Sequence, residues 1–298
     1  MDNAENDRSI SDVVSYDNID IDKSIILPKD YLSPSAIDMY LKCPKKFEYH
    51  YINNLSSPKT MSLVKGSAVH KGIETYYNLR LDNVNDIKSK DIADFAVEKL
   101  DEISAENEIS MEITEKEQAI KEVHTATSNY IDDIGVNVEP VTVEAELRCI
   151  IKGVPILGFT DLIRKMTPEE IETQNMLVED GIISEGDRNV TTVVCDNKTS
   201  NKKWMQSTLE NSLQLNIYSI GTGISQQEIH NVVLNNAGCP TYKIKAVCTK
   251  NKGYHVANLI RDVAESITKG SFPRCGLGNW WCSEKFCDFY DICRSGKV

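Results

Sequence analysis

The sequence predicts a mixed α/β fold, and three features of its pattern support this prediction. Residues 31–135 have helical periodicity, residues 141–163 alternate as a β-hairpin does, and residues 190–269 combine short apolar strands with helices. The length of 298 residues, 41% hydrophobic and 26% charged, is typical of a globular protein with a substantial core. No segment approaches the roughly 18 apolar residues of a membrane span.

The N-terminal part is expected to be a flexible acidic leader over residues 1–30, which carry eight acids and three bases. It lacks the positive region and apolar run of a signal peptide, so we expect a soluble intracellular protein, cytoplasmic if prokaryotic or phage-encoded. Order is expected from Leu32, where Ser33 and Pro34 begin a helix. Pro44 interrupts that helix, which predicts two short helices.

A single domain is expected over residues 31–298, with a helical subregion at about 81–135. Apolar spacing predicts a helix over 63–80 and a helical acidic block over 91–133. Strands are expected at 141–151 and 154–163 around a Lys152-Gly153 turn, and residues 166–190 are expected to be an irregular inserted loop. The remaining elements are predicted as strands at 190–195, 229–234 and 242–247 and helices at 207–220 and 254–269.

The net charge of −12 argues against nucleic-acid binding only when it is taken as a whole. Residues 81–146 hold eighteen acids and five bases, whereas residues 31–80 hold three acids and seven bases. Residues 191–298 hold eight acids and thirteen bases. We therefore expect the two basic segments to fold together and the acidic helices to face away from DNA.

One constellation suggests chemistry. Asp196 and Lys198 are two residues apart where a buried strand ends, so their side chains project from the same face of that strand. Asp161 lies near the end of the preceding strand. Paired strands would let Asp161 and Asp196 share a divalent cation, and carboxylate oxygens suit magnesium or manganese. Lys198 could then assist the attacking water. Glu146 is a further candidate carboxylate.

At these residues the sequence resembles the PD-(D/E)xK nuclease superfamily, in particular its RecB-like branch. Gly158 and Asp161 match the second motif of the family, and the segment Asp196-Asn197-Lys198 matches the third. Two further matches are a Gln-x-x-x-Tyr motif at Gln214 and Tyr218 and an upstream helical motif at Gly66-Ser67-Ala68-Val69-His70.

The resemblance implies a restriction-endonuclease-like core, with a mixed central sheet flanked by helices, and a hydrolase that cuts DNA with Mg²⁺ or Mn²⁺. It implies metal ligands at His70, Asp161, Asp196 and the Asn197 carbonyl, and catalytic roles for Asp161, Asp196, Lys198, Gln214 and Tyr218. Exonuclease action on DNA ends or single strands is the expected mode. Roles in DNA repair or recombination, beside a helicase or similar partner, are also implied.

The nine cysteines form a second feature, because a reducing compartment favours thiols or metal ligands over disulfides. Cys282, Cys287 and Cys293 form a compact C-terminal set that lacks a fourth member. The resemblance to iron–sulfur nucleases of the AddB and CRISPR-adaptation types implies that Cys43 completes a [4Fe–4S] site within segment 275–293. Zinc is the rival metal, and Cys275 is a substitute ligand.

Three functions were compared on this basis. A metal-dependent DNA nuclease with a structural cluster ranks first, because Asp161, Asp196 and Lys198 are all present. A non-catalytic cluster-bearing DNA-binding or scaffold subunit is the alternative, and a redox iron–sulfur protein ranks last. Phosphate contacts are expected from lysines of the basic segments: Lys42, Lys45, Lys46, Lys65, Lys202 and Lys203.

Overall fold

The computed structural model describes residues 14–15, 17, 20–84, 86–109, 112–235, 238–276 and 278–294. In this part of the chain, a six-stranded sheet has its strands in chain order. The strands are β1 (Val14–Ser15), β2 (Pro140–Ile151), β3 (Val154–Lys165), β4 (Thr192–Ser200), β5 (Gln226–Val233) and β6 (Thr241–Val247). Strands β4 and β5 are parallel, and the other neighbours are antiparallel.

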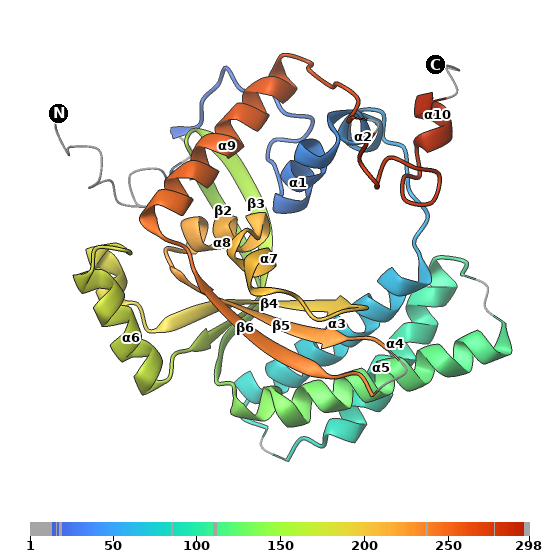
Figure 1. Ribbon diagram of the computed structural model, residues 1–298. Helices are drawn as coiled ribbons and strands as arrows, with labels where there is room; N and C mark the ends of the chain where they lie inside the picture. Colours follow the sequence, from blue (N-terminus) through green and yellow to red (C-terminus); the bar gives the residue numbers. More distant parts are fainter. Residues whose placement is uncertain are drawn as a thin grey trace.

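Helices cover both faces of the sheet (Figure 1). One face carries α1 (Pro34–Lys42), α8 (Leu213–Thr222) and α9 (Lys250–Thr268), and the other carries α3 (Met61–Leu81), α4 (Ser89–Glu106) and α5 (Ile113–Asp133). The remaining helices are α2 (Pro44–Phe47), η3 (Glu48–Ile52), η4 (Gly135–Asn137), α6 (Pro168–Glu179), η5 (Glu185–Asn189), α7 (Gln206–Glu210) and α10 (Tyr290–Arg294). No helix in the described ranges is long and apolar enough to cross a membrane.

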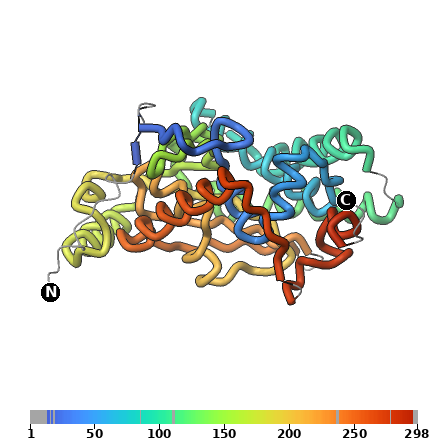
Figure 2. Tube along the Cα trace, turned by 90° about the horizontal axis from the view of Figure 1, so that it is seen from above, coloured from blue at the N-terminus to red at the C-terminus, as the bar shows by residue number. Residues whose placement is uncertain are grey.

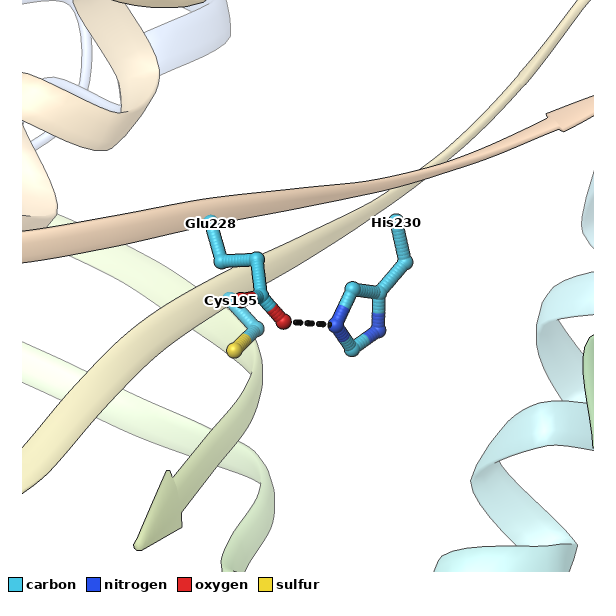
Figure 3. Close-up of side chains that lie close together, drawn as sticks. All are labelled: Cys195, Glu228 and His230. Carbon is cyan, nitrogen blue, oxygen red and sulfur yellow. Dashed lines mark hydrogen bonds and ion pairs between the residues drawn. The ribbon is translucent and has the colours of Figure 1, made fainter. Parts of the chain in front are cut away.

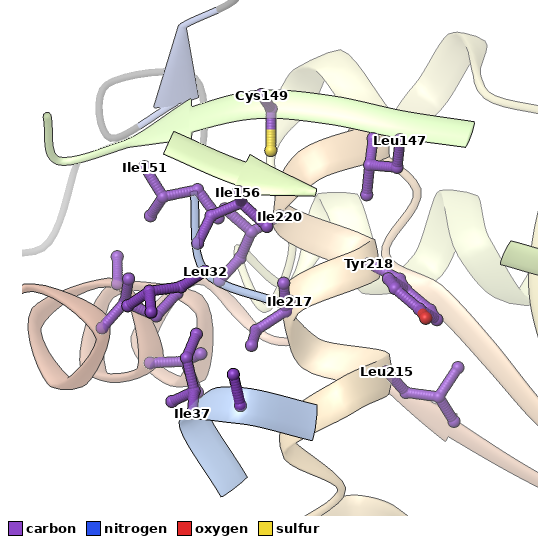
Figure 4. Packing of buried hydrophobic residues seen from close by; sticks show 14 of the residues in the cluster. Leu32, Ile37, Leu147, Cys149, Ile151, Ile156, Leu215, Ile217, Tyr218 and Ile220 are labelled. Carbon is purple, nitrogen blue, oxygen red and sulfur yellow. The ribbon is translucent and has the colours of Figure 1, made fainter. Parts of the chain in front are cut away.

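Two apolar layers hold this arrangement together, one on each side of the sheet. In the first, Ile37 of α1 and Ile217 of α8 are fully buried beneath β2 and β3 (Figure 4). In the second, Tyr77 and Val123 are fully buried between α3 and α5. Burial of apolar area on this scale is the main driving force for folding. The predicted mixed α/β fold, with a central sheet flanked by helices, is confirmed.

The predicted irregular loop at residues 166–190 is wrong, because this segment contains α6 and the short helix η5. A capping box starts α6: the Thr167 hydroxyl accepts a hydrogen bond from the Glu170 amide, and the Glu170 carboxylate accepts one from the Thr167 amide. Arg164 also holds the Glu170 carboxylate. These contacts stabilise a helix in a segment whose acidic composition favours the prediction of a loop.

Two other expectations are corrected. The helix expected at 207–220 is divided into α7 and α8, because Ser212 interrupts it and caps α8. Chain described before Leu32 already packs on the sheet: β1 pairs with β2, and Asp22 forms an ion pair of 2.6 Å with Arg261 of α9. The first 13 residues of the expected leader lie outside the described residues.

The C-terminal segment returns to the N-terminal helices. In Figures 1 and 2, α10 lies beside α2, whereas α6 lies at the opposite end of the molecule. A hydrogen bond from the Lys45 amide to the Pro273 carbonyl, 3.2 Å long, connects the two segments. The fold therefore brings Cys43 close to the cysteine-rich C-terminal segment.

Candidate active site

The pairing of β3 with β4 brings two carboxylates together. Leu162 lies opposite Cys195, so Asp161 and Asp196 come next, where this ladder ends. The Asn197 amide donates a hydrogen bond of 2.7 Å to Asp161 Oδ2. The side chain of Asp196 is fully buried and that of Asp161 is 14% exposed. The two strands thus place both acids at one point on the edge of the core.

Lys198 lies on the same face of β4 as Asp196, as strand alternation predicts. Its Nζ is 2.7 Å from Asp196 Oδ2 and donates a hydrogen bond of 2.9 Å to Gln214 Oε1. Burial lowers the pKa of Lys198, but the charge and hydrogen bond of Asp196 and the charge of Asp161 together outweigh burial, and the net shift is upward. The side chain therefore stays an ammonium ion at neutral pH, with about a quarter of its surface open to solvent.

Gln214 and Tyr218 are one turn apart on α8 and face the acids together. Gln214 Nε2 donates to Asp196 Oδ1 at 3.2 Å and to the Tyr218 hydroxyl at 3.1 Å. Gly158 of β3 makes room for the tyrosine ring, because a Cβ at this position would lie 2.9 Å from Tyr218 Cε1. The amide of Gln214 thus links Asp196 to Lys198.

His70 reaches the site from α3 on the opposite face. Gly66, one turn earlier, lets α3 approach β4, because its Cβ would lie 2.6 Å from Thr199 Oγ1. His70 Nδ1 is then 3.7 Å from Asp161 Oδ2. Burial is the main cause of a lowered pKa at His70, so the imidazole is neutral at pH 7. A neutral imidazole is the form that binds metal.

The electrostatics of the two acids suit a cation. Burial raises the pKa of Asp161 to about 6, although Lys198 and the Asn197 amide oppose the shift. Burial also raises the pKa of Asp196 to about 6, and repulsion from Asp161 adds to this. Asp196 Oδ2 is buried and forms an ion pair with the ammonium of Lys198, 2.7 Å away. Carboxylate oxygens that lie this close together suit a hard divalent cation.

Glu146 is not the additional carboxylate of this site. It is exposed and paired with Arg148, whereas Glu144 lies between the residues that pair with Leu162 and Thr160, which places it opposite Asp161. The negative charge of Glu144 contributes to the raised pKa of Asp161. Glu144 and Glu146 both lie on the exposed face of β2, and the pairing register places Glu144 opposite Asp161. Alternation alone therefore does not distinguish the two glutamates.

The expected cysteine ligands meet in one cavity of about 330 Å³ between α1, α2 and the C-terminal segment. Five cysteines line it: Cys43, Cys275, Cys282, Cys287 and Cys293. Arg294 Nη2 donates a hydrogen bond of 2.9 Å to Cys282 Sγ, and this contact is the main cause of the lowered pKa of that thiol. A lowered pKa favours the thiolate, which is the form that binds iron or zinc.

The six lysines expected at phosphates differ in their surroundings. Lys42 is 2.6 Å from Asp38 and Lys46 is 3.6 Å from Asp288, both near the cysteine cavity. Lys45 pairs with Glu48, Lys65 pairs with the buried Glu122, and Lys203 lies 4.4 Å above the ring of Tyr242. Lys202 is exposed at the end of β4.

A buried polar network behind the acids was not anticipated. Among the described residues, one group of three ligating side chains lies close together: Cys195, Glu228 and His230, all buried (Figure 3). Glu228 Oε2 is 2.7 Å from Arg164 Nη2, and its other oxygen pairs with His230. The guanidinium already satisfies this carboxylate and would repel a metal cation. We therefore interpret these three residues as a structural hydrogen-bond network and not as a metal site.

This network ends at Asn197, the residue between Asp196 and Lys198. The Tyr130 hydroxyl of α5 shares a hydrogen bond of 2.7 Å with His230 Nδ1 and donates one of 3.0 Å to Asn197 Oδ1. Its second neighbour is the Tyr77 hydroxyl, 2.9 Å away. The side chain of Asn197 is thereby fixed from the face opposite the acids. No local sequence pattern predicts this network, because its members are far apart in the chain.

Comparison with known proteins supports a family. Residues 31–174 match the model described as the PD-(D/E)XK nuclease superfamily, a range that includes His70 and Asp161 and ends before Asp196. A solved structure titled "Putative exonuclease", from Eubacterium rectale, is similar with a TM-score of 0.51 and 12% identity, over 90% of this chain and 89% of that one.

Two further results complete the comparison. A structure titled SSO0001 covers 75% of this chain and 94% of its own at 20% identity, with a TM-score of 0.30 that carries no argument. No curated protein matches the chain.

Proposed function

The chain belongs to the PD-(D/E)XK nuclease superfamily, with its restriction-endonuclease-like fold, and from this premise we propose that it is a metal-dependent DNA nuclease. The observation that carries the proposal is the arrangement of Asp161, Asp196 and Lys198 on two paired strands. The acids are close and buried, and the ammonium lies 2.7 Å from one of them. A structural role alone would not require two acids with raised pKa values beside a neutral histidine.

The metal ligands in this proposal are Asp161, Asp196, His70 and the backbone carbonyl of Asn197. Burial of Asp196 and its repulsion from Asp161 support this set, because both raise the pKa of Asp196 and a bound cation would offset both. A divalent cation held there would acidify a water molecule and neutralise charge on a phosphoryl oxygen. Mg²⁺ and Mn²⁺ both suit oxygen ligands, and the imidazole nitrogen favours Mn²⁺.

The protein's own groups orient and stabilise the reacting atoms. Lys198 remains charged, so its ammonium can bind a phosphate oxygen and stabilise the negative charge that develops during attack. Gln214 bonds to both Lys198 and Asp196 and thus keeps the ammonium directed toward the acids. Tyr218 holds the amide of Gln214 from behind. Neither of these two polar side chains needs to change its protonation state.

Exonuclease action on DNA ends or single strands is the proposed mode, and a helicase or another recombination protein is the proposed partner. The basic segments 31–80 and 191–298 supply His70, Asp196 and Lys198, so positive charge accompanies the site. DNA phosphates require such charge. The lysines expected at phosphates remain part of this proposal.

We further propose a structural [4Fe–4S] cluster in the cysteine cavity, held by Cys43, Cys282, Cys287 and Cys293. Four thiolates are the usual ligand set of such a cluster. The presence of Cys275 in the same cavity makes it the alternative fourth ligand. A broad absorbance near the visible range after anaerobic purification would support iron and sulfur, whereas a colourless protein with one equivalent of zinc would contradict the cluster.

The activity is tested by incubating wild-type protein with end-labelled single-stranded and duplex DNA in the presence of Mn²⁺. The proposal predicts cleavage with release of short products from an end. Asp196→Asn should abolish it, and Lys165→Ala, whose exposed lysine pairs with Glu139, should retain it. A wild-type protein that binds DNA and cleaves no DNA or RNA would instead support a non-catalytic scaffold subunit.

A further inference from the structure

A second cavity adjoins the candidate active site. It has a volume of about 290 Å³ and lies between the chain that enters α1, the middle of β3 and the start of α8. Gln214 and Tyr218, which bond to each other beside Asp196, form one of its walls. The cavity and the acids therefore share two side chains.

The walls of this cavity are aromatic and incompletely covered. Tyr31, Tyr51 and Phe159 line it and are each partly accessible to solvent, and the buried ring of Phe47 closes its inner side. Phe159 is 48% exposed, although it stands on a strand two residues from Asp161. Single exposed apolar side chains are common, but Phe159 lines one cavity together with Tyr31 and Tyr51, so three rings are presented to the same space.

Polar groups lie at the edge of the same cavity. Lys29 lines it, with Nζ 5.9 Å from the centre of the Tyr51 ring. The hydroxyls of Ser33 and Ser35 are 3.0 Å apart, and both residues also line it. The combination of exposed ring faces, one cation and two hydroxyls matches the chemistry of a nucleotide, in which a flat base adjoins a phosphate.

We infer that this cavity receives one unpaired base of single-stranded DNA, next to the phosphodiester cut at Lys198. The inference rests on the proposed nuclease function. A base within a duplex is paired and stacked and cannot enter, whereas the faces of all four bases stack on aromatic rings. The volume is at the lower end of the roughly 300–1,000 Å³ of small-molecule sites, which suits one base and excludes a base pair.

The test is an abasic scan. Single-stranded oligonucleotides that lack one base, at each position in turn around the cut bond, are cleaved by wild-type protein and by Phe159→Ala. In the wild type, kcat/KM should fall about tenfold when the base at one position is missing. The Phe159→Ala variant should cut the intact oligonucleotide as slowly as the wild type cuts the oligonucleotide that lacks this base. Removal of the base should not slow the variant further.

Matched variants separate stacking from folding. Phe159→Leu keeps an apolar group without a ring face and should give an intermediate loss, and Phe95→Ala, at a partly exposed ring on α4, should leave the scan unchanged. An abasic scan with no sensitive position would overturn the inference, as would a sensitivity that persists in Phe159→Ala. Either result would leave the proposed nuclease function intact.

A binding measurement separates the two proposals. Fluorescence anisotropy of the same oligonucleotides on Lys198→Ala does not depend on cleavage. A tenfold loss of affinity at one abasic position would support the base site even if the wild-type protein cut no DNA, and that outcome would reject only the nuclease. Equal affinity for intact and abasic strands would reject the base site.

Discussion

Asn197 shows how a single residue can serve both faces of the sheet. Its amide holds Asp161, its carbonyl is the proposed metal ligand, and its side chain is held by Tyr130. Partners outside the ligand set commonly change metal affinity by about 10- to 100-fold. The buried network would therefore act on the metal only through the position of this residue.

Tyr130→Phe is accordingly predicted to weaken Mn²⁺ binding about tenfold, because it removes the hydrogen bond to Asn197 and keeps the ring. Calorimetric titration with Mn²⁺ measures the effect. Tyr76→Phe, at a neighbouring buried ring that does not touch Asn197, is the control. Equal Mn²⁺ affinity in Tyr130→Phe and wild type would show that the network does not position the ligand.

The raised pKa values of Asp161 and Asp196 predict a pH dependence. Both lie near 6 in the folded protein against an ordinary value of 3.8, so the folded state holds these protons more tightly than the unfolded state does. Their stabilising contribution is present below about pH 4 and is lost as the pH rises through 6. A cation binds the ionised acids, so the stabilisation that it provides increases as the pH rises through 6.

The melting temperature should therefore rise more on addition of Mn²⁺ at pH 8 than at pH 5. Thermal unfolding with and without Mn²⁺ at the two pH values measures this difference. Asp161→Asn, which removes one of the two ionisable ligands, should show a smaller increase at pH 8 than the wild type. An equal increase at both pH values in the wild type would contradict the assignment of these acids as ligands.

At the scale of elements, regular patterns predicted regular structure. The helix α3, the hairpin β2–β3 and the strand β4 were predicted because their periodicity is continuous and their burial is one-sided or complete. The helix α6 was missed because its stability comes from a capping box and from Arg164, a contact that composition does not reveal. Glu144 was missed because it shares the exposed face of β2 with Glu146, and only the pairing register with β3 places Glu144 opposite Asp161.

Thr167→Ala tests the contribution of the cap at the level of the element. Loss of the hydroxyl should lower the free energy of unfolding by about 1 kcal/mol, because the first turn of α6 loses its acceptor. The rate of DNA cleavage should not change, since Glu170 of the cap contacts Thr167, Arg164 and Lys245 and not the acids. Chemical denaturation gives the first quantity, and an unchanged free energy of unfolding would show that Arg164 suffices to hold the helix.

At the scale of the whole molecule, the cysteine cavity joins distant parts of the chain. Cys43 comes from the junction of α1 and α2, and its partners come from the segment after α9. A metal centre there would close a loop that contains nearly the whole fold, and long closed loops stabilise most. Such a centre would stabilise the nuclease core without taking part in hydrolysis.

Cys287→Ser is predicted to remove the visible absorbance and to lower the melting temperature by more than about 5 °C. Glu284→Ala, at an exposed position of the same segment, should change neither. Absorbance and thermal unfolding of anaerobically purified proteins measure both effects. A variant with intact absorbance would remove Cys287 from the ligand set.

The central claim is that Lys198 and the two acids hydrolyse DNA with a divalent cation. The most direct measurement is single-turnover cleavage of end-labelled single-stranded DNA by wild type and Lys198→Ala over a range of Mn²⁺ concentrations. The claim predicts a wild-type rate that saturates with Mn²⁺ and a rate at least about 100-fold lower in Lys198→Ala at the same metal affinity. Equal rates in the two proteins, or no cleavage by the wild type at any Mn²⁺ concentration, would contradict it.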